Sequence, residues 1–125
     1  MKRIHITIFS LILCIIGWAC GSNENKSNSD STNDYTQSPV YKKGVQLIAT
    51  NDCLTCHTVD KAVTGPSYKD VAQKYPNDDA SVDLLAEKIV KGGKGNWGQI
   101  PMTPHPQLSL DDAKAMVQYI FLFKK

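Results

Sequence analysis

Four segments of the chain place hydrophobic residues three or four positions apart, which is the spacing of one helix face. These segments are residues 40–50, 67–75, 81–91 and 111–123. Their apolar faces comprise Tyr41, Val45 and Ile48; Tyr68, Val71, Ala72 and Tyr75; Val82, Leu85, Ala86 and Ile89; and Ala113, Met116, Val117, Ile120 and Phe123. No stretch of the sequence alternates cleanly between turn signals, as a half-buried strand does. The pattern therefore predicts an all-α domain.

Residues at the segment ends support these helices. Pro66 suits the first turn of the second helix and Pro76 its end. Gly92 is placed as the C-terminal cap of the third helix. Ser109, with Asp112 three residues later, approximates a capping box at the start of the fourth.

The connection over residues 92–108 is longer than the roughly 12–15 residues beyond which structureless loops become uncommon. It contains Trp97, Ile100, Met102 and Leu108 among three prolines and four glycines. Such a composition is unusual for a solvated linker, so we expect a non-protein group to organise this loop.

The N-terminus has a different pattern. A basic start, Met1-Lys2-Arg3, precedes an almost wholly apolar run over residues 4–19. The run is shorter than the ~20 residues of a membrane-spanning helix. A charged start, a short apolar run and small residues at its end are typical of a secretory signal. Residues 1–19 are therefore predicted to be a signal peptide.

The end of the signal, Gly17-Trp18-Ala19-Cys20-Gly21-Ser22, resembles a bacterial lipobox, with Cys20 as the lipid-bearing residue. It departs from the usual motif at Gly17, where leucine is usual, and at Trp18. Plain secretion and an uncleaved anchor remain the alternatives. Residues 20–38 contain one aromatic and no aliphatic side chain beyond Cys20, so we expect a disordered tether. The folded domain is predicted over residues 39–125.

Charge and length narrow the possible functions. From Cys20 onward the chain has 12 basic and 12 acidic side chains, and this balance excludes a strongly electrostatic nucleic-acid binder. The four cysteines are too few and too unevenly spaced for a disulfide-stapled scaffold. A domain of 87 residues is marginal without a staple or a cofactor.

The candidate chemistry lies in Cys53-Leu54-Thr55-Cys56-His57, a C-x-x-C-H motif. This spacing is typical of covalent haem attachment, in which Cys53 and Cys56 form thioethers and His57 is the proximal iron ligand. A zinc site would need a further ligand pair. A thioredoxin-like pair would need strands, and a structural disulfide between Cys53 and Cys56 is the remaining alternative. We predict one haem c.

Met102 is predicted to be the second axial ligand, because Pro101 and Pro104 stiffen the loop that presents its thioether. Met116 lies on an apolar helix face and is predicted to be core. His105 as a bis-His partner, or an open iron, are the alternatives. Two strong ligands would leave no vacancy for oxygen or peroxide, which indicates electron transfer.

The domain resembles the class I c-type cytochromes, in particular the small bacterial single-haem kind. The resemblance covers residues 40–125 and rests on the C-x-x-C-H motif, Thr64-Gly65-Pro66, residues 92–98, and residues 100–106 around Met102. It implies three core helices and a shorter one around an edge-exposed haem.

The resemblance also implies three residue roles. The Pro66 carbonyl would accept the Nδ1 proton of His57, Trp97 would lie near the haem propionates, and Gly44 and Tyr119 would mark a crossing of the first and last helices. The alternatives are a mere turn at Gly65-Pro66, a packing role for Trp97 and an incidental Gly44.

The predicted function is a monomeric, non-enzymatic electron carrier with unknown redox donor and acceptor proteins. It would act on the periplasmic side or at the cell surface, held to a membrane by lipid on Cys20. The alternatives are a haem enzyme or small-gas sensor with a displaceable Met102, and a fixed electron-entry subunit of a larger complex. A fixed partner would favour a large exposed apolar patch.

Overall fold

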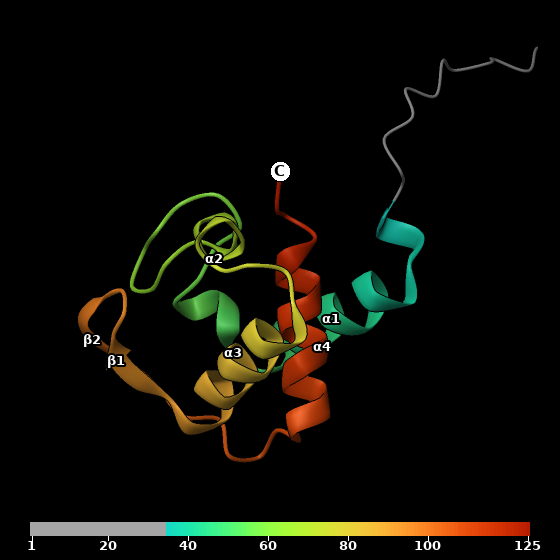
Figure 1. Cartoon of the computed structure of the whole chain (residues 1–125). Helices are drawn as coiled ribbons and strands as arrows, with labels where there is room; N and C mark the ends of the chain where they lie inside the picture. Colours follow the sequence, from blue (N-terminus) through green and yellow to red (C-terminus); the bar gives the residue numbers. More distant parts are fainter. Residues whose placement is uncertain (1–34) are drawn as a thin grey trace, which may run out of the picture. The chain divides into compact units, whose positions relative to one another are not determined.

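The computed structural model describes residues 35–125, and the predicted all-α fold is confirmed in its main features. The helices are α1 (Pro39–Thr50), α2 (Tyr68–Lys74), α3 (Asp79–Lys91) and α4 (Leu110–Phe121), with short 3-10 helices η1 (Tyr35–Gln37) and η2 (Cys53–Thr55). Helix α4 packs on α1, α2 and α3 (Figure 1). Three longer helices and the short α2 thus form the expected architecture.

Helix α4 contributes more buried residues to the core than any other helix, and its predicted apolar face is buried except for the partly exposed Phe123. Met116 and Val117 are each only 1 % exposed. They pack in one cluster with buried residues of the other helices, including Ile48 of α1, Ala72 of α2 and Ala86 of α3. Met116 is therefore a core residue, as predicted.

A two-stranded antiparallel hairpin was not predicted. Strands β1 (Gly93–Gly95) and β2 (Gly98–Met102) pair with Gly93 opposite Met102 and Gly95 opposite Gly98. Both strands are almost wholly exposed, so their side chains show no alternation between buried and solvent-facing positions. Without that alternation the sequence has no strand signal.

The helix caps follow the sequence, with one correction. Gly92 ends α3 with a φ of 70°, and its N–H donates to the Lys88 carbonyl at 2.9 Å. Ser109 caps α4 by accepting from the Asp112 N–H. Pro66 is not in the first turn of α2, because Ser67 is the N-cap and accepts from the Asp70 N–H.

The described structure also begins earlier than the predicted domain. Tyr35–Gln37 form η1, the Tyr35 ring lies 5.9 Å from the Tyr41 ring, and Ser38 caps α1. Described structure therefore extends four residues before the predicted boundary at Pro39, into a stretch whose polar composition predicts a tether. The predicted signal peptide (residues 1–19), Cys20 and most of the predicted tether lie outside the described residues.

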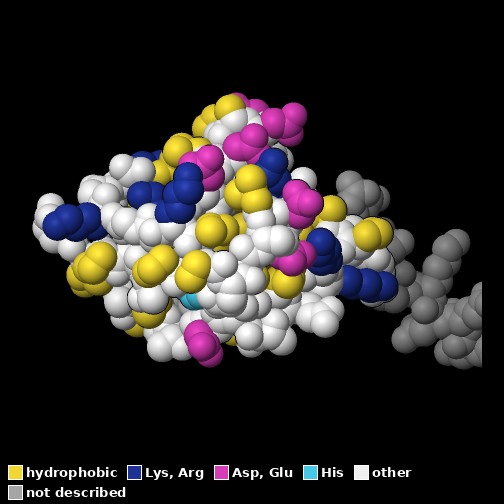
Figure 2. Space-filling model, turned by 90° about the horizontal axis from the view of Figure 1, so that it is seen from below, with side chains coloured by type: hydrophobic (Ala, Val, Ile, Leu, Met, Phe, Trp, Pro, Cys, Tyr) yellow, Lys and Arg dark blue, Asp and Glu magenta, His cyan; other side chains and the backbone are white. Residues whose placement is uncertain are grey.

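The surface shows where apolar side chains remain exposed. Among the large ones are Leu54, Val63, Leu84, Trp97 and Ile100. Figure 2 shows apolar side chains and lysines at the end of the molecule where the hairpin lies.

Within residues 35–125, none of the helices has the length and hydropathy needed to cross a bilayer.

Helices α1 and α4 cross at Gly44, as the resemblance implied. A Cβ at Gly44 would lie 2.2 Å from Tyr119 Cβ and 3.0 Å from the Ala115 carbonyl oxygen. Both neighbours are fixed parts of α4, so they cannot yield as the end of a flexible side chain would. Gly44 thus lets the two backbones approach.

Gly44→Ala should therefore force α1 and α4 apart. Overpacking a well-packed core typically costs about 1–3 kcal/mol, and we expect a loss of unfolding free energy in that range. Denaturant unfolding of the haem-loaded protein measures it, with Gln46→Ala on the exposed side of α1 as control. An unchanged transition midpoint in Gly44→Ala would contradict the close approach.

Asp112 links α4 to α1. Its Oδ1 lies 3.0 Å from Lys43 Nζ, and its Oδ2 accepts from Ser109 Oγ at 2.8 Å. The hydrogen bond from Lys43, and then that from Ser109, lower the pKa of this carboxyl. The stability it contributes is present above its unfolded pKa, about 3.9, and is lost as the pH falls through the folded value.

We expect Asp112→Asn to flatten the fall in melting temperature on acidification below about pH 4. The variant should be slightly less stable than the parent at pH 7 and should approach it at pH 2. Calorimetry over this range checks the result. Asp111→Asn, which removes neither hydrogen bond, should keep the parent's pH profile.

Candidate functional site

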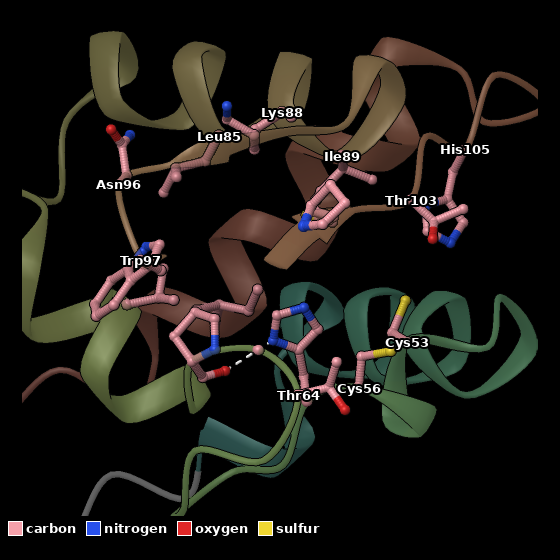
Figure 3. A pocket seen from close by; sticks show the side chains of 18 of the residues that line it. Cys53, Cys56, Thr64, Leu85, Lys88, Ile89, Asn96, Trp97, Thr103 and His105 are labelled. Atoms are coloured by element: carbon pink, nitrogen blue, oxygen red, sulfur yellow. Dashed lines mark hydrogen bonds between the residues drawn. The ribbon is translucent and has the colours of Figure 1, made fainter. Parts of the chain in front are cut away.

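A cavity of about 600 Å³ lies between α2, α3, α4 and the hairpin. The residues that the sequence analysis assigns to the haem site all line it: Cys53, Cys56, His57, Pro66, Trp97 and Met102. In Figure 3, Cys53 and Cys56 lie at one end of the cavity and Trp97 at the other. Core residues Ile48, Met116, Val117 and Ile120 also line it, so whatever fills the cavity extends the hydrophobic core.

The two cysteines are positioned by a tight turn. Asp52, in the left-handed conformation with φ 57°, turns the chain into η2. The N–H groups of Cys56 and His57 both donate to the Cys53 carbonyl, at 3.2 and 3.0 Å. Both thiols are free and partly buried, so the two do not form a disulfide. Burial raises the pKa of the Cys53 thiol, and the Asp52 carboxylate raises it further.

His57 has a fixed tautomer. Its Nδ1 lies 2.7 Å from the Pro66 carbonyl oxygen, the contact dashed in Figure 3. A carbonyl can only accept, so Nδ1 carries the proton and Nε2 keeps its lone pair. The hydrogen bond that the resemblance implied is therefore present, and Nε2 is the nitrogen available to a metal.

Two neighbouring residues, Gly65 and Tyr68, also constrain the position of the imidazole. A Cβ at Gly65 would lie 2.4 Å from His57 Cε1, so only glycine leaves room for the ring. The Tyr68 ring is nearly parallel to it, with centroids 5.8 Å apart and an interplanar angle of 17°. His57 thus has a defined orientation as well as a defined tautomer.

Tyr68 is a site residue that sequence reasoning missed. It was assigned only to the core, where it is indeed 3 % exposed, but its ring also lines the cavity. Its hydroxyl is buried with no hydrogen-bond partner among the described residues, and burial raises its pKa. Helical spacing could not reveal this role, since it depends on the fold of residues 57–67 around His57.

Met102 lies at the end of β2, partly buried against the core. A Cβ at Gly92 would lie 2.6 Å from the Met102 carbonyl oxygen, so this backbone packs closely against the end of α3. The His105 N–H donates to the carbonyls of Ile89 and Val90, both at 3.1 Å. The loop around Met102 is thereby pinned to the C-terminal turn of α3.

His105 lines the same cavity, and its Nδ1 is buried with no hydrogen-bond partner among the described residues. Two lysines, Lys88 and Lys94, line the cavity on the hairpin side. Asp52 is the one carboxylate that lines it. The cavity is thus mainly apolar, with positive charge at one side.

Trp97 occupies the turn of the hairpin and is 44 % exposed. Lys74 Nζ lies over its ring, 4.2 Å from the centroid. The side chain is therefore neither a buried packing residue nor a free surface residue.

The arrangement fits a covalently held haem. Two free thiols, an imidazole with an unprotonated Nε2 and a thioether face one apolar cavity, whose volume lies within the roughly 300–1,000 Å³ typical of cofactor pockets. Gly65 is the position where any side chain would displace the imidazole. Within residues 35–125 there is no group of three or more His, Cys, Asp or Glu side chains that could hold another metal ion.

Comparison with known proteins agrees with this class of domain. The cytochrome c family model matches residues 41–121. Cytochrome c-551 of Allochromatium vinosum is 44 % identical over 85 residues, which cover 68 % of this chain and 90 % of that protein. Cytochrome c-552 of Nitrosomonas europaea is 45 % identical over 78 residues, which cover 62 % of this chain and 76 % of that protein. The crystal structure of wild-type Nitrosomonas europaea cytochrome c552 superposes with a TM-score of 0.60, at 44 % identity, over 64 % of this chain and 99 % of that chain.

The chain belongs to the cytochrome c family. Proteins of this family are electron carriers rather than enzymes, and they bind one haem c covalently through cysteine residues. The predicted class of protein and the predicted cofactor are therefore confirmed.

Proposed function

We propose that this chain is a single-haem electron carrier in which Cys53 and Cys56 hold the haem and His57 and Met102 are the axial ligands of its iron. The observation that carries the proposal is the 2.7 Å contact between His57 Nδ1 and the Pro66 carbonyl. It leaves Nε2 as the only ring nitrogen able to bind iron, at a cavity shared with both thiols and the Met102 thioether.

The bound haem supplies one chemistry, the exchange of one electron between Fe(II) and Fe(III). The protein's residues hold the haem and set the potential at which this electron is exchanged. Two thioethers keep the cofactor in place, and Pro66 holds the His57 imidazole in one orientation. The Met102 thioether favours the ferrous state and raises the reduction potential compared with an imidazole. With His57 and Met102 both bound to the iron, the site would have no vacancy for a substrate.

Trp97 has a supporting role in this proposal. Its indole lies at the hairpin edge of the cavity, at the opposite end from the cysteines in Figure 3. The indole N–H is a donor only, so it suits a carboxylate of the haem edge. Redox partner proteins would approach there, where apolar side chains and lysines are exposed.

The N-terminal assignments complete the proposal. Residues 1–19 would direct export, Cys20 would carry lipid, and residues 20–38 would tether the domain on the periplasmic side or at the cell surface. Tethering would raise the effective concentration near membrane-bound donors and acceptors without any new contact. An unmodified Cys20 would leave an exported protein without this anchor.

Cys20→Ala should release the protein from the membrane fraction into the soluble fraction while its haem content stays constant. Immunoblots of fractionated cells measure the distribution, and a labelled fatty acid should be incorporated by the parent and not by Cys20→Ala. Cys14→Ala is the matched control, since that cysteine is placed within the signal. An equal distribution of parent and Cys20→Ala would reject the lipid anchor.

The absorption spectrum of the purified full chain tests the haem assignment. We expect a c-type spectrum that persists after denaturation, reversible reduction, and a weak long-wavelength band from sulfur to ferric iron. A high-spin ferric spectrum would point to an open iron. A low-spin spectrum without the band would point to a bis-His site with His105. Absence of haem after expression with the attachment machinery would overturn the proposal.

A further inference from the structure

The hairpin at the cavity is poorly supported from within. It has only two short strands, and its Gly93, Gly95 and Gly98 have φ values of 128°, 109° and 113°. A Cβ built at Gly95 or Gly98 would have no atom within 4 Å, so the turn packs against nothing there. An isolated two-stranded hairpin is marginally stable at best in water. Contacts from another part of the domain are therefore needed to keep the hairpin at the cavity.

The C-terminal end of α2 contacts the hairpin. The two hydrogen bonds join residues that are 21 and 22 positions apart in the sequence. Lys74 Nζ donates to the Asn96 carbonyl at 2.8 Å and lies 4.2 Å from the centre of the Trp97 ring. Asn96 Nδ2 donates to the Tyr75 hydroxyl at 3.3 Å. These contacts reach the two residues at the tip of the hairpin, between β1 and β2.

Lys74 is committed to this contact. The ion pairs of the described residues use Lys43, Lys69, Lys91 and Lys114. Lys74 is in none of them, and its ammonium instead combines a charge-assisted hydrogen bond with a cation–π contact. Tyr75 is itself fixed, because its carbonyl accepts from Lys124 Nζ at 2.7 Å.

We propose that Lys74 is a positioning residue, which holds the Asn96–Trp97 turn against α2 and so keeps Trp97 and the hairpin in place at the cavity. The inference rests on the proposed function, since it gives Trp97 a task at the haem. Beyond that function, we infer that the position of the hairpin depends on the Lys74 ammonium, which does not itself line the cavity. Loss of that ammonium should let the hairpin open locally while the helices stay folded.

The experiment is amide hydrogen exchange by NMR on the full chain with haem attached, in the diamagnetic ferrous state. Lys74→Met removes the ammonium and keeps the length of the side chain. We expect β1 and β2 amides to exchange about tenfold faster, because exchange reports local opening, while amides of α3 and α4 keep their rates. The reduction potential of the same samples is the second readout.

Two variants separate positioning from charge. Lys74→Arg keeps a cation that can both donate to the Asn96 carbonyl and lie over the indole, so it should restore slow exchange and the parent's potential. Lys94→Met removes a charge from the hairpin itself, so it should shift the potential without the tenfold change in exchange. Unchanged hairpin exchange in Lys74→Met, equal acceleration in Lys94→Met, or failure of arginine to rescue would each overturn the inference.

The proposed function and this inference fail in different ways. A chain without covalent haem, or with iron that cannot be reduced reversibly, contradicts the function before any lysine is changed. A normal cytochrome spectrum together with unaltered hairpin exchange in Lys74→Met contradicts the positioning role alone.

Discussion

Met102→Ala is expected to keep its covalent haem and to lose the weak long-wavelength sulfur-to-iron band. Without the thioether, the ferric state is no longer disfavoured, so the reduction potential should fall. Axial ligands alter haem potentials over about 0.8 V, and we expect a drop on the order of 0.1 V or more. Spectroelectrochemistry on the purified chain measures both quantities in one titration.

Met116 provides the matched control. It is the other methionine among residues 35–125, it also lines the cavity, and it is 1 % exposed in the core. Met116→Leu conserves volume and should keep the band, at a stability cost of less than about 1.5 kcal/mol. If the band survives in Met102→Ala but disappears in Met116→Leu, then Met116 is the iron ligand and Met102 is not. Loss of the band in His105→Ala would instead show that this histidine supports the iron site.

The second large effect concerns the cysteines. The double variant Cys53→Ala/Cys56→Ala should contain no haem after denaturation and extraction with acidified organic solvent. It should also lose its cooperative unfolding transition. Ile48, Met116, Val117 and Ile120 line both the core and a cavity of about 600 Å³, so an empty cavity deprives them of packing on one side. A domain of this size has little stability in reserve.

Circular dichroism and haem staining of denaturing gels check this result. Each single cysteine variant keeps one thioether and should retain part of the attached haem. Thr55→Ala, a change between the cysteines at the same cavity, should keep all of it. Haem that stays with the double variant through denaturation would show that these thiols are not the attachment points.

Much of this architecture follows from local sequence. The spacing of apolar residues located the four α-helices, because a helix that is buried on one face has apolar residues every three or four positions. The C-x-x-C-H motif and the stiff loop at Met102 indicated which residues would meet at the cavity, because each is a short-range chemical pattern. Gly92 and Ser109 marked helix ends for the same reason.

Features that depend on tertiary contact were not predictable in this way. The hairpin has no buried face, so Gly93–Met102 contains no alternation to detect. The contacts of Lys74 with Asn96 and Trp97 span 22 and 23 residues and become visible only once α2 and the hairpin are adjacent. Tyr68 was recognised as apolar, but its position against His57 depends on how residues 57–67 fold back. The aromatic contact of Tyr35 lay in a stretch whose composition pointed to disorder.

Four rings run in sequence along the crossing of α1 and α4. The Tyr35 ring touches Tyr41, Tyr41 lies 5.3 Å from Tyr119, and Tyr119 lies 5.2 Å from Phe123, so side chains join the first described residue to the C-terminal end. None of the four lines the cavity. A mechanical pull on the N-terminal segment would therefore load this row of rings and the α1–α4 crossing first. The rings would take up this load outside the cavity, whereas Ile48 of α1 and Met116 of α4 line the cavity from the same two helices.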